Sequence, residues 1–394
     1  MKALQIRRSV RRFGMARLTS PLSPSGAVRV GPVELTDVSE PARPPGPGWH
    51  RFETSLAGIC GSDLSLIDGH ASSYFDDWVS FPFVPGHEVV GRLEDGRRVV
   101  LEPVLGHAAR GAVPPWPDAA PGDGHDYAHL VTGPLEPGIQ TGFCCSTGGG
   151  WSPWFWAHES QLHFLPDHMP DERAVLVEPI AGAVHGAVMA ANSPTERRNG
   201  VIAVLGAGTM GLASIAAVRQ QIPDGLIVAG GRYPHQLTLA KEFGADVVTD
   251  GGGLARAVRR ATGSHRIGSA LSGGADVVID AVGSSESISG AITMARPGGT
   301  VVLLGMPAEV SLDLTALWHR QVNLRGCYTY GTELVNGQPV RTFDIAVQLA
   351  DMIGAERLLS ATYPLERHVD ALAHAAAAGR RGAVKIAFDL RGAN

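Results

Sequence analysis

The segment 201–211, VIAVLGAGTMG, restricts the possible folds of this 394-residue chain more than any other stretch. Its first five residues are aliphatic and predict a buried parallel strand, which leads directly into a glycine-rich turn and an alanine-rich helical segment. In such a turn the first glycine permits the bend, the second lets a pyrophosphate approach the backbone, and the third lets the helix pack against the strand. A second aliphatic run, 226–229, follows where a βαβ unit needs its next strand. The segment therefore predicts a dinucleotide site that includes Gly206, Gly208, Thr209, Met210 and Gly211.

The end of the second predicted strand indicates which dinucleotide binds. An NAD site usually places Asp or Glu there to hold the ribose 2′-hydroxyl. This chain instead has Gly231, Arg232 and Tyr233, with no carboxylate. The glycine leaves room for a 2′-phosphate, the arginine can pair with that phosphate, and Tyr233 or Arg232 can cover the adenine. We therefore expect NADP(H); the alternative is a solvated arginine in a glycine-rich turn.

Composition limits the classes of partner. With 44% hydrophobic and 18% charged residues, the chain is long enough for two domains with sizeable cores. A net charge of −5 gives no overall electrostatic footprint for nucleic acid or an anionic membrane, so we expect a small-molecule partner. No apolar run approaches the roughly 20 residues that span a bilayer, and the arginine-rich start lacks the apolar region of a secretory signal. We expect a cytoplasmic protein whose four cysteines are reduced.

Residues 1–170 are rich in Gly, Pro, His and Trp and predict an irregular, mostly β domain. Two motifs lie in this region, GICGSD with Cys60 and PGHEVVG with His87. Thiol and imidazole are ligands that Zn²⁺ selects, although each residue alone is also compatible with a packed thiol or a satisfied imidazole. The later runs 275–281 and 300–304 predict further parallel strands, whose ends bring Val282 and Gly305 to the ligand-binding edge of the sheet.

Taken in order, GICGSD, PGHEVVG, VEPIAGAVH and VLGAGTMG resemble the medium-chain, zinc-dependent alcohol and polyol dehydrogenases over nearly the whole chain. The resemblance implies an α/β protein with a GroES-like β catalytic domain, 1–178 and 326–394, and a doubly wound Rossmann domain, 179–325. It also implies a homodimer or homotetramer, paired through the sheet edge near 300–304 and 323–328. The implied metal ligands are Cys60, His87 and Glu178, with Glu88 as a nearby carboxylate and Glu178 as in the sorbitol and glucose dehydrogenase branch.

This ligand set explains the chemistry that the resemblance implies. Three protein ligands leave one position of Zn²⁺ open, where a substrate hydroxyl can lose its proton near neutral pH and release hydride to the nicotinamide. Ser62 matches the first relay hydroxyl for that proton, although a serine at this place is also compatible with capping the loop. Asp63 is expected to orient the metal ligands. The predicted activity is that of a zinc-dependent oxidoreductase acting on an alcohol or carbonyl substrate; a zinc-free quinone or enone reductase and a non-catalytic NADPH-binding protein are the alternatives.

The sequence also departs from the family pattern. The region 101–130 contains no cysteine, so a structural zinc held by four thiolates is excluded there, and His107, Asp118 and His125 are read as solvated loop residues. Ser65 stands where relatives often carry a relay histidine, and His70 is the candidate substitute. The aromatic segment 151–156 is compatible with either a substrate pocket or ordinary core.

Overall fold

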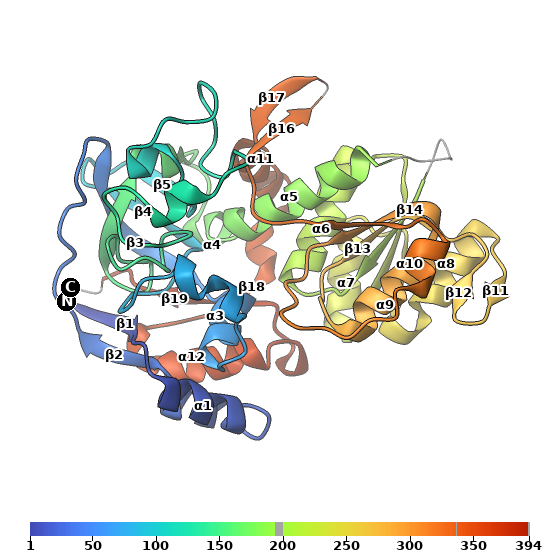
Figure 1. Cartoon of the computed structure of the whole chain (residues 1–394), viewed down its shortest axis with the longest axis horizontal. Coiled ribbons are helices and arrows are strands. Elements are labelled where there is room, and N and C mark those ends of the chain that lie inside the picture. Colours follow the sequence, from blue (N-terminus) through green and yellow to red (C-terminus); the bar gives the residue numbers. More distant parts are fainter. Residues whose placement is uncertain (194–199, 336, 393–394) are drawn as a thin grey trace. The chain divides into compact units, whose positions relative to one another are not determined.

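The computed structural model describes residues 1–193, 200–335 and 337–392. The chain divides into two compact units, Met1–Glu178 with Ala350–Asn394, and Pro179–Leu349 (Figure 1). Together they have the expected α/β architecture, in which a mainly antiparallel sheet belongs to the first unit and a parallel sheet to the second. Within the described residues, no helix combines the length and apolar character needed to cross a membrane.

The first unit is built on a seven-stranded sheet in the order β18-β19-β3-β4-β5-β7, with β6 also paired to β3. Aromatic side chains fill the core behind it: Phe52 stacks on Phe155 at 4.8 Å between ring centroids, and Trp151 meets Phe388 edge to face at 5.1 Å. Trp151 and Phe155 are completely buried, so these two members of the aromatic segment are core residues. The strands are β3 (Trp49–Gly58), β4 (Val89–Leu93), β5 (Arg98–Leu101), β6 (Trp154–His158), β7 (Leu162–Phe164), β18 (Leu359–Tyr363) and β19 (Lys385–Asp389).

A helical insertion distinguishes the N-terminal region from the mostly β structure expected there. The antiparallel strands β1 (Lys2–Ile6) and β2 (Val33–Asp37) are separated by α1 (Val10–Thr19) and α2 (Pro24–Val30). Both helices begin at a serine whose side chain accepts a backbone N–H bond, and α2 has proline in its first turn. Helix α12 (His368–Ala376) packs against α2 (Figure 1).

The cysteine-free region is held by a buried arginine. Arg110 ends the short helix η2 (Ala108–Arg110) and is 2% exposed. Its guanidinium donates to four backbone carbonyls, those of Gly138 at 2.7 Å, Glu136 at 3.2 Å, Thr132 at 3.3 Å and Leu135 at 3.5 Å. The planar guanidinium of Arg110 thus holds the segment 132–138 in place by hydrogen bonds.

The second unit is a six-stranded parallel sheet in the order β10-β9-β8-β13-β14-β15. The direction of strand succession reverses between β8 and β13, and open α/β sheets bind ligands at such a point. The doubly wound Rossmann fold that the family resemblance implies is therefore confirmed. Its strands are β8 (Val201–Leu205), β9 (Leu226–Gly231), β10 (Val247–Asp250), β13 (Ala275–Asp280), β14 (Ala295–Leu303) and β15 (Asn323–Gly326).

The remaining elements connect or flank these sheets. The other helices are α3 (Gly61–Ile67), α4 (Asp171–Ala174), α5 (Val177–Ala191), α6 (Thr209–Gln221), α7 (Pro234–Glu242), α8 (Leu254–Thr262), α9 (Ser285–Met294), α10 (Thr315–His319) and α11 (Thr342–Ile353). The other strands are β11 (Arg266–Ile267), β12 (Ala270–Leu271), β16 (Thr332–Val335) and β17 (Gln338–Arg341).

The chain leaves the first unit after Glu178 and returns to it at Ala350, whereas the sequence suggested a return at 326. The hairpin β16–β17 accounts for the difference, because Glu333 contacts His185 Nδ1 at 2.5 Å and the Thr342 hydroxyl at 3.1 Å, both within the second unit. The first unit begins again where the guanidinium of Arg173 donates to Asp351 at 2.5 Å and to Glu356 at 2.6 Å and 2.8 Å.

Candidate metal centre and coenzyme turn

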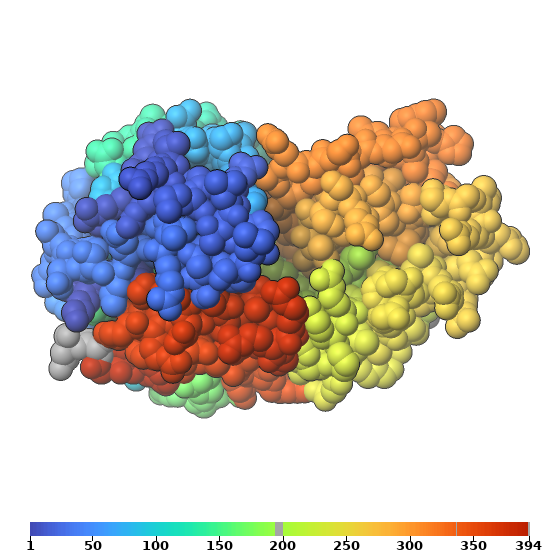
Figure 2. Space-filling view, turned by 90° about the horizontal axis from the view of Figure 1, so that it is seen from below, coloured from blue at the N-terminus to red at the C-terminus, as the bar shows by residue number. Residues whose placement is uncertain are grey.

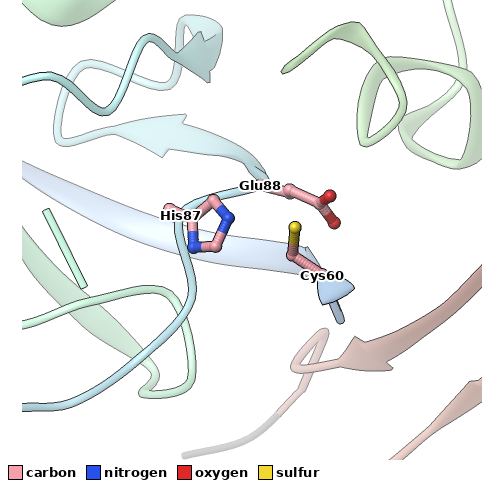
Figure 3. Close-up of side chains that lie close together, drawn as sticks. All are labelled: Cys60, His87 and Glu88. Carbon is pink, nitrogen blue, oxygen red and sulfur yellow. The ribbon is translucent and has the colours of Figure 1, made fainter. Parts of the chain in front are cut away.

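A group of three potential metal ligands lies inside the first unit. One donor atom from each of Cys60, His87 and Glu88 lies within 4.8 Å of the other two (Figure 3). Cys60 follows the end of β3, and His87 and Glu88 precede the start of the antiparallel neighbour β4, so strand pairing brings the two sequence motifs together. Thiol, imidazole and carboxylate are the donor types of a zinc site, and the cluster therefore fits Zn²⁺.

Asp63 braces two members of this group. Its carboxylate, 1% exposed, accepts a bond from the Cys60 backbone N–H at 2.9 Å and lies 3.6 Å from Nδ1 of His87. Because Nδ1 faces Asp63, Nε2 is the nitrogen of His87 available to a metal, which is the usual carboxylate–histidine–metal relation. Burial lowers the pKa of His87, but the negative charge of Asp63, the contact with Cys60 and the charge of Glu178 hold that pKa well above its ordinary value. These neighbouring groups therefore favour a positive charge at His87.

Glu88 is fixed by a buried ion pair that sequence reasoning missed. Its carboxylate is 1% exposed and accepts a bond from Nζ of Lys385, which is 4% exposed, at 2.5 Å. Lys385 begins β19, which pairs with β3. A Cβ at Gly58 would lie 2.1 Å from Oε2 of Glu88, so a glycine is needed to admit the carboxylate. A lysine within the otherwise apolar run 384–388 was the available sequence signal.

Glu178 lies outside the group of three. It occupies the first turn of α5, is partly buried, and its negative charge contributes to raising the pKa of both His87 and Lys385. Of the expected ligand set, Cys60 and His87 are thus brought together. Glu88 is the carboxylate of the compact group, and Glu178 is a second carboxylate whose charge acts on His87.

Ser62 lies in the first turn of α3, between Cys60 and Asp63. The carboxylate of Asp63 accepts the capping bond of this helix from the Cys60 N–H, and the Ser62 hydroxyl has no hydrogen-bond partner among the residues that the structure describes. Its geometry gives no support to the loop-capping alternative. Ser65 and His70 are both exposed, and the bond between them joins the His70 N–H to the Ser65 carbonyl at 2.8 Å.

The loop residues His107, Asp118 and His125 belong to no cluster of potential metal ligands in the described part of the chain. His107 stacks on His129 at 3.7 Å between ring centroids, and both Asp118 and His125 are exposed. In the described part of the chain, the potential metal group is that of Cys60, His87 and Glu88.

The three glycines of the predicted coenzyme turn in the second unit differ in their surroundings. Gly206 has φ +93°, which a side chain would strain, and a Cβ at Gly211 would lie 1.8 Å from the Gly206 carbonyl oxygen. A Cβ at Gly208 would meet nothing within 4 Å, so open space adjoins the position that a pyrophosphate approaches. Thr209 and Met210 begin α6, whose N-terminal N–H groups suit phosphate.

The end of β9 retains the features expected for a 2′-phosphate. Gly231 is buried, while Arg232 is exposed and its guanidinium has no ion pair or hydrogen bond among the described residues. Tyr233 is partly exposed and stacks on His235 at 5.9 Å. At the ends of β13 and β14, Val282 is 51% exposed, and Gly305 packs against Gly283 so closely that a Cβ would lie 2.4 Å from the Gly283 nitrogen.

Comparison with known proteins gives consistent matches in both units. The alcohol dehydrogenase GroES-like domain family matches residues 46–167, and the zinc-binding dehydrogenase family matches residues 210–338. Sorbitol dehydrogenase of Pongo abelii is 27% identical over 367 residues, covering 91% of this chain and 94% of that protein. A zinc-binding dehydrogenase of Sinorhizobium meliloti bound to NADP has a TM-score of 0.67, and an alcohol dehydrogenase of Escherichia coli complexed with NADH has a TM-score of 0.68. Each of these two structures is 20% identical and covers 99% of both chains, and at that identity the likeness shows the fold alone.

Proposed function

Because the chain belongs to the zinc-dependent medium-chain alcohol and polyol dehydrogenases, we propose that it transfers hydride between an alcohol or carbonyl substrate and NADP(H), using one catalytic Zn²⁺. The observation that carries this proposal is the compact group of Cys60, His87 and Glu88, of which His87 and Glu88 are buried. Bound zinc supplies Lewis acidity toward a substrate oxygen. The thiolate of Cys60 and Nε2 of His87 hold the ion, and Asp63 fixes the orientation of both ligands.

The two carboxylates divide the remaining roles. We infer that Glu88 and Glu178 both serve the same metal, Glu88 from within the compact group and Glu178 from the first turn of α5. Lys385 holds the Glu88 carboxylate in place through its buried bond. Zinc affinity of Glu88→Gln and Glu178→Gln, measured by competition with a chelator, should fall in each variant; an unchanged affinity in one of them excludes that residue from the metal site.

We propose that the hydroxyl of Ser62 relays the substrate proton. It is partly exposed, follows the ligand Cys60 by two residues, and is not occupied by another bond in the described structure. Such a hydroxyl can pass a proton from a substrate oxygen toward solvent.

The preference for NADP(H) rests on Arg232. The exposed guanidinium at the end of β9 can form a bidentate pair with a 2′-phosphate. Gly231 has no side chain, so no carboxylate at this position repels the phosphate. The coenzyme is decided by these residues, since the fold accommodates either NADP or NADH.

Three further properties belong to the same proposal. The proposed substrate is a small alcohol or polyol, and the similarity of most of the chain to sorbitol dehydrogenase of Pongo abelii supports it. The edge strand β15, whose residues are largely exposed, is the proposed site of pairing in a homodimer, alone or within a homotetramer. The four cysteines are free thiols, which supports a reducing, cytoplasmic location.

The test is turnover of the zinc-loaded enzyme on a panel of polyols and simple alcohols with NADP⁺ and NAD⁺. We expect oxidation of at least one polyol with NADP⁺ preferred, and loss of turnover in Cys60→Ser. A chain that reduces quinones or enones without zinc, or that binds NADPH without turning over any substrate of the panel, would contradict the proposal.

A further inference from the structure

The charge of the chain is unevenly distributed. Residues 1–32 contain seven of the 33 Lys and Arg residues and none of the 38 Asp and Glu residues, whereas the other 362 residues carry 26 Lys and Arg against 38 Asp and Glu. The overall charge of −5, which gave no reason to expect an anionic surface as partner, averages over this difference. The cationic segment coincides with the helical insertion of the first unit.

The exposed side of α1 carries a row of residues without polar side chains. Val10, Gly14 and Leu18 follow one another at intervals of four residues and therefore lie along one side of the helix, opposite the buried Ala16. Val10 is 87% exposed and Leu18 is 79% exposed. A large aliphatic side chain at such exposure buries little apolar area in the fold, and here two occur on one side of a single helix, about two turns apart.

Arginines border this apolar row on both sides. By helical geometry Arg17 projects beside Val10 and Arg11 beside Leu18, on opposite edges of the row, and both are exposed. Leu22, just after the helix, is 87% exposed, and Arg8, just before it, is also exposed. Exposed aliphatic and cationic side chains thus share one surface, and this combination suits contact with the anionic interface of a bilayer.

A groove beside α1 adds a site for an anionic group. It has a volume of about 490 Å³ and is lined in part by Arg12, Arg29 and His368, from α1, α2 and α12. Arg12 is paired with Glu34, whereas Arg29 is exposed and has no ion pair in the described ranges of the chain. A phosphate that enters the groove therefore meets an uncompensated guanidinium.

These features lie together on one face of the molecule. Figure 2 shows the blue N-terminal residues as a continuous area of surface, next to the red residues that include α12. The apolar row stands on the outer side of a helix instead of lining a groove, so it suits a flat bilayer better than an extended acidic peptide.

We propose that the face formed by α1 and the turn that follows it docks reversibly on anionic phospholipid membranes. Val10, Leu18 and Leu22 enter the interface between headgroups and acyl chains, and Arg11 and Arg17 contact lipid phosphates. The catalytic group of Cys60, His87 and Glu88 takes no part in this docking.

The experiment is co-sedimentation of the full chain with vesicles of phosphatidylcholine and phosphatidylglycerol in about a 2:1 ratio, compared with vesicles of phosphatidylcholine alone. We expect binding to the anionic vesicles only, weakening as salt is added. The double variant Arg11→Gln, Arg17→Gln should bind about 30-fold more weakly, since each arginine near such a surface contributes roughly a fivefold increase in affinity. Leu18→Asp should lower binding by at least as much.

The matched control removes the same charge from another exposed helix end, with Arg259→Gln and Arg260→Gln on α8. This variant should bind the anionic vesicles as the wild type does, and all variants should keep wild-type melting temperature and turnover. Equal binding to neutral vesicles, absence of binding to both, or equal loss in the α8 control would overturn the proposal. Salt-sensitive self-association that disappears in Arg11→Gln, Arg17→Gln without vesicles would assign the face to a second copy of the chain and would also overturn it.

Discussion

Arg110→Met tests whether a single buried cation organises the cysteine-free loop. The substitution keeps most of the side-chain volume but removes donors to four carbonyls, and two of these bonds, at 2.7 Å and 3.2 Å, have favourable lengths. A bond from a charged donor contributes roughly 1.5–3 kcal/mol, and part of this is offset because the mutant no longer desolvates a guanidinium. Counting the two shorter bonds fully and the longer pair weakly, we expect a loss of about 3–5 kcal/mol in the free energy of unfolding.

The loss should appear as local opening of the loop between Arg110 and Gly138. Urea denaturation measures the free energy, and limited proteolysis followed by mass spectrometry locates the opened segment. Arg367→Met is the control, because Arg367 is exposed, pairs with Asp370 three residues on and lies over the Tyr363 ring, and we expect a change below about 1 kcal/mol for such surface contacts. An Arg110→Met protein within about 1 kcal/mol of wild type, with unchanged cleavage in this segment, would refute the reasoning.

Three other predictions concern coenzyme, proton transfer and pH. Arg232→Ala should weaken NADPH binding about ten- to a hundredfold without affecting NADH, as measured by titrating both; an unchanged preference removes Arg232 from the coenzyme site. Ser62→Ala should keep zinc and coenzyme while turnover falls by roughly 10² or more, and near wild-type turnover would exclude the relay role. Burial, reinforced by the charge of His107, lowers the pKa of His129 to about 4. Because the unfolded histidine takes up its proton at a higher pH, the contribution of the neutral ring is complete above about pH 6.5 and is lost as pH falls toward 4; after solvent screening we expect about 1 kcal/mol. His129→Phe should flatten the dependence of unfolding free energy on pH in that window, and an unaltered slope would contradict the assignment.

The parts of the fold that sequence could predict are those fixed by local sterics. The strand and glycine turn at 201–211 form because Gly206 needs a positive φ and Gly211 must approach the Gly206 carbonyl, and both demands are visible in the glycine spacing. Cys60 and His87 could be brought together only through the family resemblance, because their meeting depends on the pairing of β3 with β4.

The features that the sequence did not predict depend on long-range contacts, or their residues also fit a simpler structural interpretation. Lys385 meets Glu88 across 297 residues, and no local pattern specifies that pairing. From the sequence, Arg110 would be expected on the surface, because its four carbonyl partners lie more than 20 residues further along the chain. The helices α1 and α2 did have local signals, Ser9 and the pair Ser23 and Pro24, but the surrounding strand-rich composition outweighed them.

The most direct test of the central claim is the zinc content of the purified chain, measured by elemental analysis beside that of the double variant Cys60→Ser, His87→Ala. We predict one zinc per wild-type chain, because Cys60, His87 and Glu88 form the metal group of the described residues and the loop 101–130 has no thiolate for a second. We predict no stoichiometric zinc in the double variant, with the wild-type fold and NADPH binding retained. A wild-type content near two, or zinc that stays at full occupancy in the variant, would contradict it.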